Sequence, residues 1–297
     1  MIPAEFEEHS YEAPLYNQLE RGNPYVYTPG QVLENKVGFD RGLFVSQMAL
    51  WQTLGYKNPL QGAALAYYDW PYAWGPSHPR GQLPKFRLNL FLQAKRPVYY
   101  QRRPRSLKSI HGMSGPLWSF RVTQHQQKLL EVLAQKTGRR AHVAYAAAAF
   151  HTKSDLFGHT TGRTIVQNST FPSVRVLSGH DAWYYWMAGA TGAANPKPEN
   201  IEEPALLDRV LDLAREGEID EGRDLTWLNP LAGDVIESAG AAAGLAEGVT
   251  AHFFDDLLTL GRLAERNELA PEFLAYARVN LFTIRFDLNW LLVMPDK

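Results

Sequence analysis

The chain has 297 residues, of which 45% are hydrophobic and 21% charged, and its formal net charge is −1. This length allows one large domain or two modest ones, with enough apolar material for a core. Cysteine is absent, which excludes disulfides and thiolate zinc sites. We find no run of 18 apolar residues and no N-terminal signal segment, so we expect a cytoplasmic protein that does not associate with membranes.

The charges are unevenly distributed along the chain. Residues 70–130 contain eleven Lys and Arg and no Asp or Glu, whereas residues 199–297 contain eight basic and twenty acidic side chains, a net charge of −12. A basic segment on one surface attracts phosphate backbones and gains affinity by releasing their counterions. The alternative is that it pairs with the acidic region of the same chain. Charge alone leaves both interpretations open.

The first hundred residues predict a helix followed by strands. Residues 3–29, rich in Pro, Asn and Tyr, read as irregular, and the spacing of apolar residues over 33–54 predicts a helix that ends at Gly55. Residues 63–68 are a candidate strand, and residues 70–84 hold four prolines and read as a hairpin loop. Residues 86–94 alternate and predict a mostly buried strand, ended by Pro97.

The remainder of the chain adds a helix, short strands and a mainly helical end. Leucines at helical spacing predict a helix over 124–135. Residues 141–150 fit a buried strand better than a helix, because they follow Gly138, and residues 174–177 are a further strand candidate. Asn195 to Pro198 read as a linker. Beyond it, three segments look helical: 205–215, 250–265 and 271–293. Within the last of them, residues 282–290 alternate strictly enough to form a strand instead.

This order of elements predicts an α/β fold: a central mixed sheet flanked by helices, with an appended C-terminal helical region. We expect two parts, residues 1–196 and residues 197–297. The acidic second part is expected to bind a second copy of the chain or a separate sensor subunit, because its charge repels DNA. Its expected anchors are the alternating apolar side chains of the last segment: Phe282, Ile284, Phe286, Leu288 and Trp290. The alternative is that these residues pack back on the core of the first part.

The residues that suggest chemistry lie at the end of the strand predicted over 86–94. Residues two apart on a strand point to the same face, so Gln93 and Lys95 project together. Asp69 ends the preceding candidate strand, 24 residues earlier, and a long hairpin would bring it beside Gln93. Glu34 and Asp40, on or just before the first helix, would complete a metal shell. Carboxylate and amide oxygens suit Mg²⁺, and a neighbouring Lys can orient or deprotonate an attacking water.

These motifs carry a family resemblance. Asp40, the Leu-Gly-Tyr at 54–56, Asp69 and the Gln93-Ala94-Lys95 triplet resemble the Mrr-like branch of the PD-(D/E)XK nucleases, in which Gln-x-Lys replaces the acid-x-Lys signature. The resemblance covers residues 34–96, about a fifth of the chain. It implies a restriction-endonuclease-like core, with Asp69 and Gln93 holding Mg²⁺ or Mn²⁺ and Lys95 as the catalytic lysine. The helix acid would be Asp40 or the nearby Glu34.

The resemblance further implies a metal-dependent endonuclease on double-stranded DNA, similar to nuclease effectors of bacterial anti-phage defence systems. The alternative is a nuclease fold that has lost activity and serves as a DNA-binding or scaffold subunit. Phosphate contacts are expected from the basic side chains after the triplet: Arg96, Arg102, Arg103, Arg105 and Lys108. A rival metal site would be His151, Asp155 and His159, spaced four apart, although Gly158 argues against a helix through them.

Overall fold

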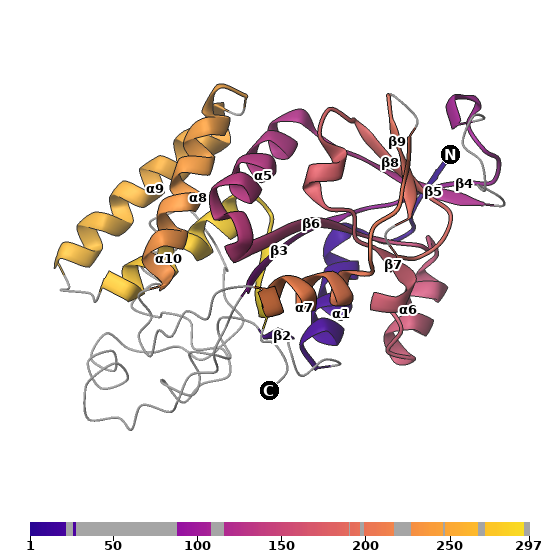
Figure 1. Cartoon of the computed structure of the whole chain (residues 1–297), viewed down its shortest axis with the longest axis horizontal. Coiled ribbons are helices and arrows are strands. Elements are labelled where there is room, and N and C mark those ends of the chain that lie inside the picture. Colours follow the sequence, from indigo (N-terminus) through magenta and orange to yellow (C-terminus); the bar gives the residue numbers. More distant parts are fainter. Residues whose placement is uncertain are drawn as a thin grey trace.

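The structure is a computed structural model of the whole chain. It describes residues 1–21, 26–27, 88–107, 116–189, 191–196, 199–216, 227–245, 247–266 and 271–293. These residues form an α/β protein with two β-sheets, as the sequence predicts at the level of fold class (Figure 1). Within these ranges no helix combines the length and apolar character needed to cross a membrane. The predicted helix over 33–54 and the predicted strand over 63–68 lie outside the described residues.

A five-stranded mixed sheet forms the centre of the molecule. Its strand order is β2 (Val26–Tyr27), β11 (Asn289–Val293), β3 (Leu88–Lys95), β6 (Ala141–Ala148) and β7 (Ser169–Thr170). Only β3 and β6 run parallel, joined by helix α5 (Gln124–Thr137), and the other pairs are antiparallel. A parallel pair needs such a crossover connection. The sequence-based predictions of β3, α5 and β6 are confirmed, and β6 is buried on both faces.

A six-stranded antiparallel sheet extends from one end of the first. Its order is β1 (Ile2–Pro3), β4 (Val98–Tyr100), β5 (Leu117–Arg121), β8 (Ala182–Tyr185), β9 (Gly192–Asn195) and β10 (Glu199–Ile201). Gly192 is required in β9, because a Cβ there would lie 2.3 Å from the ring of Trp183. Trp183 is fully buried and donates a hydrogen bond from Nε1 to Thr170 Oγ1 (3.2 Å), which joins the two sheets.

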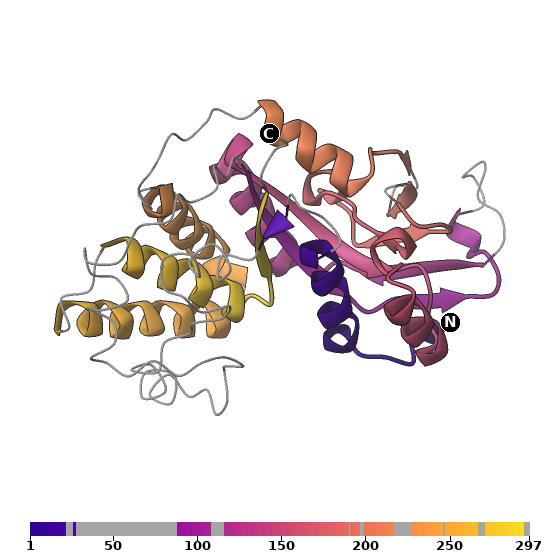
Figure 2. The same ribbon diagram turned by 90° about the horizontal axis from the view of Figure 1, so that it is seen from below.

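Helices cover both faces of the central sheet (Figures 1 and 2). On one face, α1 (Glu8–Arg21) and α7 (Leu206–Glu216) cover the side chains of Leu90, Leu92 and Ala144. The N-terminal stretch was predicted to be irregular, and that prediction is wrong. Helix α1 forms despite Pro14 because Tyr11, Leu15 and Leu19 are buried against the sheet, and tertiary packing outweighs local propensity.

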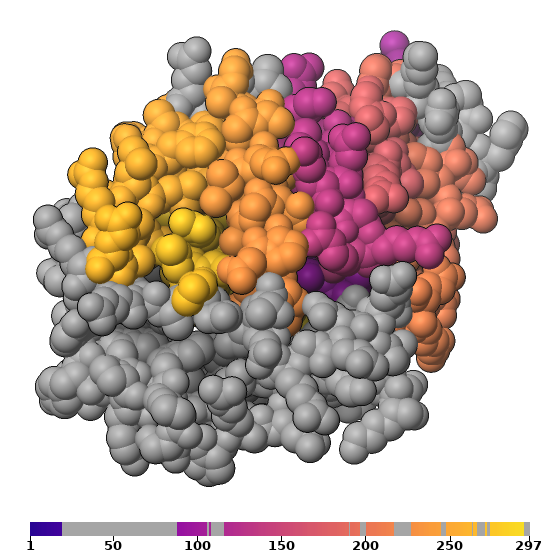
Figure 3. Space-filling view, turned by 60° about the vertical axis from the view of Figure 1, so that its left-hand side comes forward, coloured from indigo at the N-terminus to yellow at the C-terminus, as the bar shows by residue number. Residues whose placement is uncertain are grey.

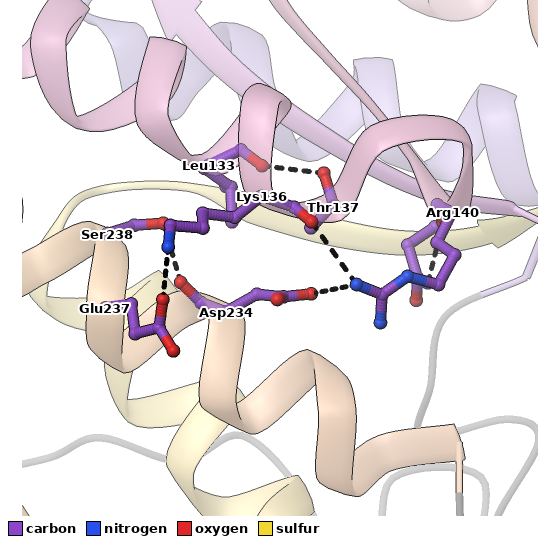
Figure 4. A network of polar contacts seen from close by, with 8 residues as sticks. Leu133, Lys136, Thr137, Arg140, Asp234, Glu237 and Ser238 are labelled. Carbon is purple, nitrogen blue, oxygen red and sulfur yellow. Dashed lines mark hydrogen bonds and ion pairs between the residues drawn. The ribbon is translucent and has the colours of Figure 1, made fainter.

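The other face of the sheet packs against α5 and a helical layer. This layer contains α8 (Leu228–Ala242), α9 (Glu247–Arg266) and α10 (Pro271–Arg285), and α8 lies beside α5 (Figure 3). Two ion pairs join this region to α8 (Figure 4). Lys136 of α5 pairs with Glu237, and Arg140, three residues beyond α5, has its Nη2 2.8 Å from Asp234 Oδ2.

The C-terminal residues contribute to the same core as the rest of the chain. After α10 the chain enters β11, which lies between β2 and β3 in the central sheet. The expected boundary at residue 196 therefore separates neither the sheet nor the hydrophobic core of the described part. The expected interface anchors Phe282, Phe286, Leu288 and Trp290 are all buried in this core, which corrects that expectation; Ile284 is 41% exposed.

The remaining described elements are short. Helix α6 spans Lys153–Thr161. Residues Val174–Leu177, predicted as a strand, form a 3₁₀ helix instead, begun by the Ser173 side chain, which accepts a hydrogen bond from the Arg175 backbone N–H. The other described 3₁₀ turns are Arg105–Leu107, Gly138–Arg140, Val166–Asn168 and Ala243–Leu245.

Candidate functional site

The Gln93-Ala94-Lys95 triplet lies at the carboxyl end of β3. Gln93 pairs in register with Tyr145 of β6, and Lys95 with Ala147. Side chains of paired residues share a face of the sheet, so Gln93 and Lys95 lie on the α5 face, with Tyr145. Because β3 and β6 are parallel, their carboxyl ends lie at the same edge, where open α/β sheets commonly bind ligands.

Gln93 is fully buried, and neither its amide oxygen nor its amide nitrogen has a hydrogen-bond partner in the described part of the chain. Leaving a buried polar group unpaired costs about 1–3 kcal/mol. A neighbouring glutamine shows the usual outcome: buried Gln127 of α5 accepts a hydrogen bond from Tyr145 Oη (2.8 Å) and donates one to the Val174 carbonyl oxygen (2.7 Å). The amide of Gln93 is thus free to act as a ligand, but it is enclosed by protein.

Lys95 is half-buried and points from the same face. Its ammonium nitrogen donates a hydrogen bond to Gln126 Oε1 (2.5 Å) and lies 5.8 Å from the ring centroid of Tyr145. Burial lowers the pKa of Lys95, while the negative charges of Glu8 and Asp287 act in the opposite direction. A lysine with a lowered pKa beside carboxylates is typical of functional sites.

The predicted partners of the triplet, Glu34, Asp40 and Asp69, lie outside the described residues. Along β3, residues 88–92 pair with β11 on one side, and residues 89–95 pair with β6 on the other. Strands β11 and β6 therefore occupy both edges of β3 along residues 89–92. An antiparallel neighbour was expected, but β11 provides it from about 200 residues later in the chain.

The predicted phosphate-binding arginines are not equivalent. The guanidinium of Arg96 already has partners within the chain. It pairs with Glu7 (Nη1–Oε1 2.8 Å) and donates a hydrogen bond to the Ala4 carbonyl oxygen (Nε–O 3.0 Å). Arg103 donates to the carbonyl oxygen of Leu107. Arg102 and Arg105 are exposed. Lys108 lies outside the described residues.

The sequence analysis did not identify a group of possible metal ligands on α1 and in the turn before β11. His9 and Glu12 of α1 and Asp287, which precedes β11, each offer a ligand atom, and these atoms all lie within 4.8 Å of one another. His9 Nδ1 is 2.9 Å from Glu12 Oε2, and this contact raises the pKa of His9. Burial raises the pKa of Glu12, and the charges of Asp287 and Glu8 add to the increase.

A helical reading of residues 8–21 would have placed Glu8, His9 and Glu12 on one side of a helix. The prolines at 3 and 14 obscured that reading.

The rival cluster at 151–159 is not assembled in the structure. His151 precedes α6 and stacks on Tyr99, with ring centroids 3.9 Å apart. His159 Nδ1 lies 2.9 Å from Thr164 Oγ1. Asp155 lies in the first turn of α6, where its backbone N–H donates to Thr152 Oγ1 (3.0 Å), and these three residues form no metal-ligand group in the described ranges.

The fold and these residues define an α/β protein with a polar site at one edge of its central sheet. No protein-family model matches the chain, and neither a curated protein nor a solved structure matches it significantly.

Proposed function

We propose that this protein is a metal-dependent endonuclease that hydrolyses DNA phosphodiester bonds, with Lys95 as its catalytic lysine. The observation that carries the proposal is the environment of Lys95. This half-buried lysine has a lowered pKa, lies two residues from a buried amide without a partner, and interacts with the charges of Glu8 and Asp287. Such a combination of burial and specific charges marks a candidate active site.

The topology around β3 supports a restriction-endonuclease-like core. The β3–α5–β6 unit is parallel, and β3 has the antiparallel neighbour β11 on its other side. The parallel strand–helix–strand unit fits a mixed sheet flanked by helices, although β11 at the end of the chain occupies the antiparallel position where the resemblance implies a preceding strand. The Gln93 and Lys95 side chains leave β3 on one face, as that chemistry requires.

The residues present fit a divalent cation. Amide and carboxylate oxygens are the ligands that Mg²⁺ and Mn²⁺ prefer, and Gln93 Oε1 has no hydrogen-bond donor among the described residues. The expected ligands are Gln93, with Asp69 and either Glu34 or Asp40. A bound divalent cation would stabilise the charge that develops on the phosphate and lower the pKa of a water.

Lys95 has two properties that suit phosphodiester hydrolysis. Its hydrogen bond to Gln126 holds the ammonium group at the edge of the sheet, and in the protonated form this group neutralises charge on a phosphate oxygen. Because burial lowers its pKa, the neutral amine is more accessible near neutral pH than in an exposed lysine, and the neutral form can accept a proton from the attacking water.

The wider role is proposed from the resemblance alone: an effector of a bacterial anti-phage defence system that acts with a second copy or a sensor subunit. One observation favours the alternative of an inactive DNA-binding or scaffold subunit, because Gln93 is fully buried. In an active enzyme the amide has to become accessible when DNA and metal bind.

Incubation of the purified chain with supercoiled plasmid separates these functions. An active nuclease nicks or linearises the plasmid with Mg²⁺ or Mn²⁺ and is inhibited by EDTA. Retention of the plasmid in a gel-shift assay without cleavage, with or without metal, identifies the DNA-binding alternative and contradicts the nuclease.

A further inference from the structure

We propose that His9, Glu12 and Asp287 bind a divalent transition-metal ion of the Mn²⁺ or Zn²⁺ type. This site goes beyond the proposed nuclease, whose expected ligands are other residues, and it does not depend on that activity. Its three ligands come from two segments nearly 280 residues apart, the first turns of α1 and the turn between α10 and β11.

The spacing of the three ligand atoms fits one ion. They all lie within 4.8 Å of one another, and His9 Nδ1 and Glu12 Oε2 are already 2.9 Å apart. Metal–ligand bonds of roughly 2.0–2.2 Å place two ligands at most about 4.4 Å apart. Small side-chain rotations would therefore close the group around an ion. The imidazole favours Mn²⁺ or Zn²⁺ over Mg²⁺, which prefers ligand sets made of oxygen alone.

The charges of the group favour a cation. Glu12 and Asp287 each offer a carboxylate oxygen, and these atoms lie within 4.8 Å of one another, so the two negative charges repel each other. The Glu12 side chain is only 13% exposed, and its Oε1 is buried without a partner in the described part. A buried carboxylate oxygen without a partner is costly, and a divalent ion would compensate it.

A second buried polar group lies on the same helix. Tyr16 lies one turn beyond Glu12 on α1, is 8% exposed, and its hydroxyl has no hydrogen-bond partner among the described residues. Burial raises the pKa of Tyr16 strongly, and the negative charges of Glu12 and Asp287 act in the same direction. Two successive turns of α1 thus carry a buried oxygen without a partner, and waters on a bound ion would supply hydrogen bonds there.

Access and rigidity also suit ion binding. The His9 side chain is 81% exposed, so solvent reaches the group from that side, whereas the Glu12 side chain is only 13% exposed. Asp287 has a positive φ of 55°, a conformation that Asn tolerates as Asp does. Asp287→Asn therefore removes the charge without changing the preferred backbone.

Isothermal titration calorimetry on the full chain, freed of metal with EDTA and then dialysed, tests this site with MnCl₂, ZnCl₂ and MgCl₂. At this site we expect one Mn²⁺ or Zn²⁺ per chain, bound more tightly than Mg²⁺, in addition to any ion at the proposed nuclease site. Glu12→Gln and Asp287→Asn should each weaken binding at least about tenfold. His9→Gln, at an exposed position that cannot affect folding strongly, should weaken it as well. The control Asp212→Asn, an exposed carboxylate on α7, should bind as the wild type does.

Absence of Mn²⁺ and Zn²⁺ binding to the wild type, or unchanged affinity in all three variants, would overturn the site. The nuclease is judged separately by plasmid cleavage. Metal binding that is lost in the variants, in a chain that never cleaves DNA, would support this site and contradict the nuclease. Cleavage by a chain whose three variants bind metal normally would support the nuclease and overturn this site.

Discussion

The ammonium nitrogen of Lys95 lies 2.5 Å from Oε1 of Gln126, and this hydrogen bond ties the end of β3 to the first turn of α5. Thr123 Oγ1 donates to the same oxygen at 3.2 Å. The lysine is thereby held on the α5 face of the sheet, while the charges of Glu8 and Asp287 reach it from α1 and from the turn before β11. Burial lowers the pKa of Lys95, and three elements that are far apart in the sequence thus orient this side chain and act on its charge.

Gln93→Leu should stabilise the protein. Its buried amide has no partner in the described part of the chain, so removing it relieves a penalty of about 1–3 kcal/mol while leaving the volume similar. Urea denaturation measures the change in the free energy of unfolding. The matched control is Gln127→Leu, which removes hydrogen bonds to Tyr145 and the Val174 carbonyl and should destabilise. Equal destabilisation by both variants would show that the Gln93 amide is satisfied.

Trp290→Ala should destabilise the folded chain by roughly 3–5 kcal/mol, because it removes a large buried side chain. Trp290 is 5% exposed, stacks on Phe91 with centroids 6.3 Å apart, and donates from Nε1 to Asn89 Oδ1 at 3.0 Å. Thermal and urea unfolding measure the loss, with Ile284→Ala, 41% exposed, as the control. Wild-type stability of Trp290→Ala combined with loss of an oligomer in light scattering would instead make Trp290 an interface anchor.

His142 should make the protein less stable in acid. Burial, with the charges of Arg209 and Arg175, lowers the pKa of His142 to about 3, from about 6.5 in the unfolded chain. Between these values the unfolded state binds the additional proton. The contribution is therefore intact above about pH 6.5 and decreases by up to about 1.4 kcal/mol per pH unit as the pH falls toward 3.

The unfolding free energy from pH 7 to pH 4 measures this effect. His142→Gln should reduce the slope of the unfolding free energy against pH over that range by the equivalent of about one bound proton. His125→Gln, at an exposed position, should leave this slope unchanged. Identical slopes for the wild type and His142→Gln would mean that His142 is not held neutral in the folded protein.

Reversing Arg102 and Arg105 to Glu should weaken DNA binding at all sequences alike. Both side chains are exposed, whereas Arg96 is already paired with Glu7. Each phosphate contact contributes about 0.9 to the log–log slope of affinity against salt, so losing two contacts should reduce the slope by about 1.8. Fluorescence anisotropy with a labelled duplex measures both quantities. The charge-matched control reverses Lys128 and Arg139, which are exposed on α5 and just beyond it. An equal loss in both double variants would indicate a nonspecific effect of net charge.

Local patterns predicted the centre of the fold but not its long-range partners. The alternation of β3, the leucine spacing of α5 and the apolar run of β6 are each contained in a short stretch, and the structure confirms all three. Helix α1 was missed, because Pro14 disfavours a helix locally and the stability of α1 comes from burying Tyr11 and Leu15 against the sheet.

The residues of the candidate site, too, could be predicted only where the pattern is local. Gln93 and Lys95 were found because two residues on one strand share a face. Asp287 was not found, because its place beside β3 depends on pairing between β11 and a strand 200 residues earlier. The alternation over 282–290 reflects two structures in succession, the end of α10 and the start of β11, which a single periodicity cannot express.

Plasmid cleavage by Lys95→Ala tests the central claim most directly. Cleavage of supercoiled plasmid with Mg²⁺ or Mn²⁺ is compared among the wild type, Lys95→Ala and Lys128→Ala, whose lysine is exposed on α5. Loss of a positioned acid–base group lowers rates by about a hundredfold or more, so Lys95→Ala should cut at least that much more slowly while retaining its fold and most of its DNA affinity. Lys128→Ala should cut as the wild type does. A Lys95→Ala protein that cuts at the wild-type rate would contradict the assignment of Lys95.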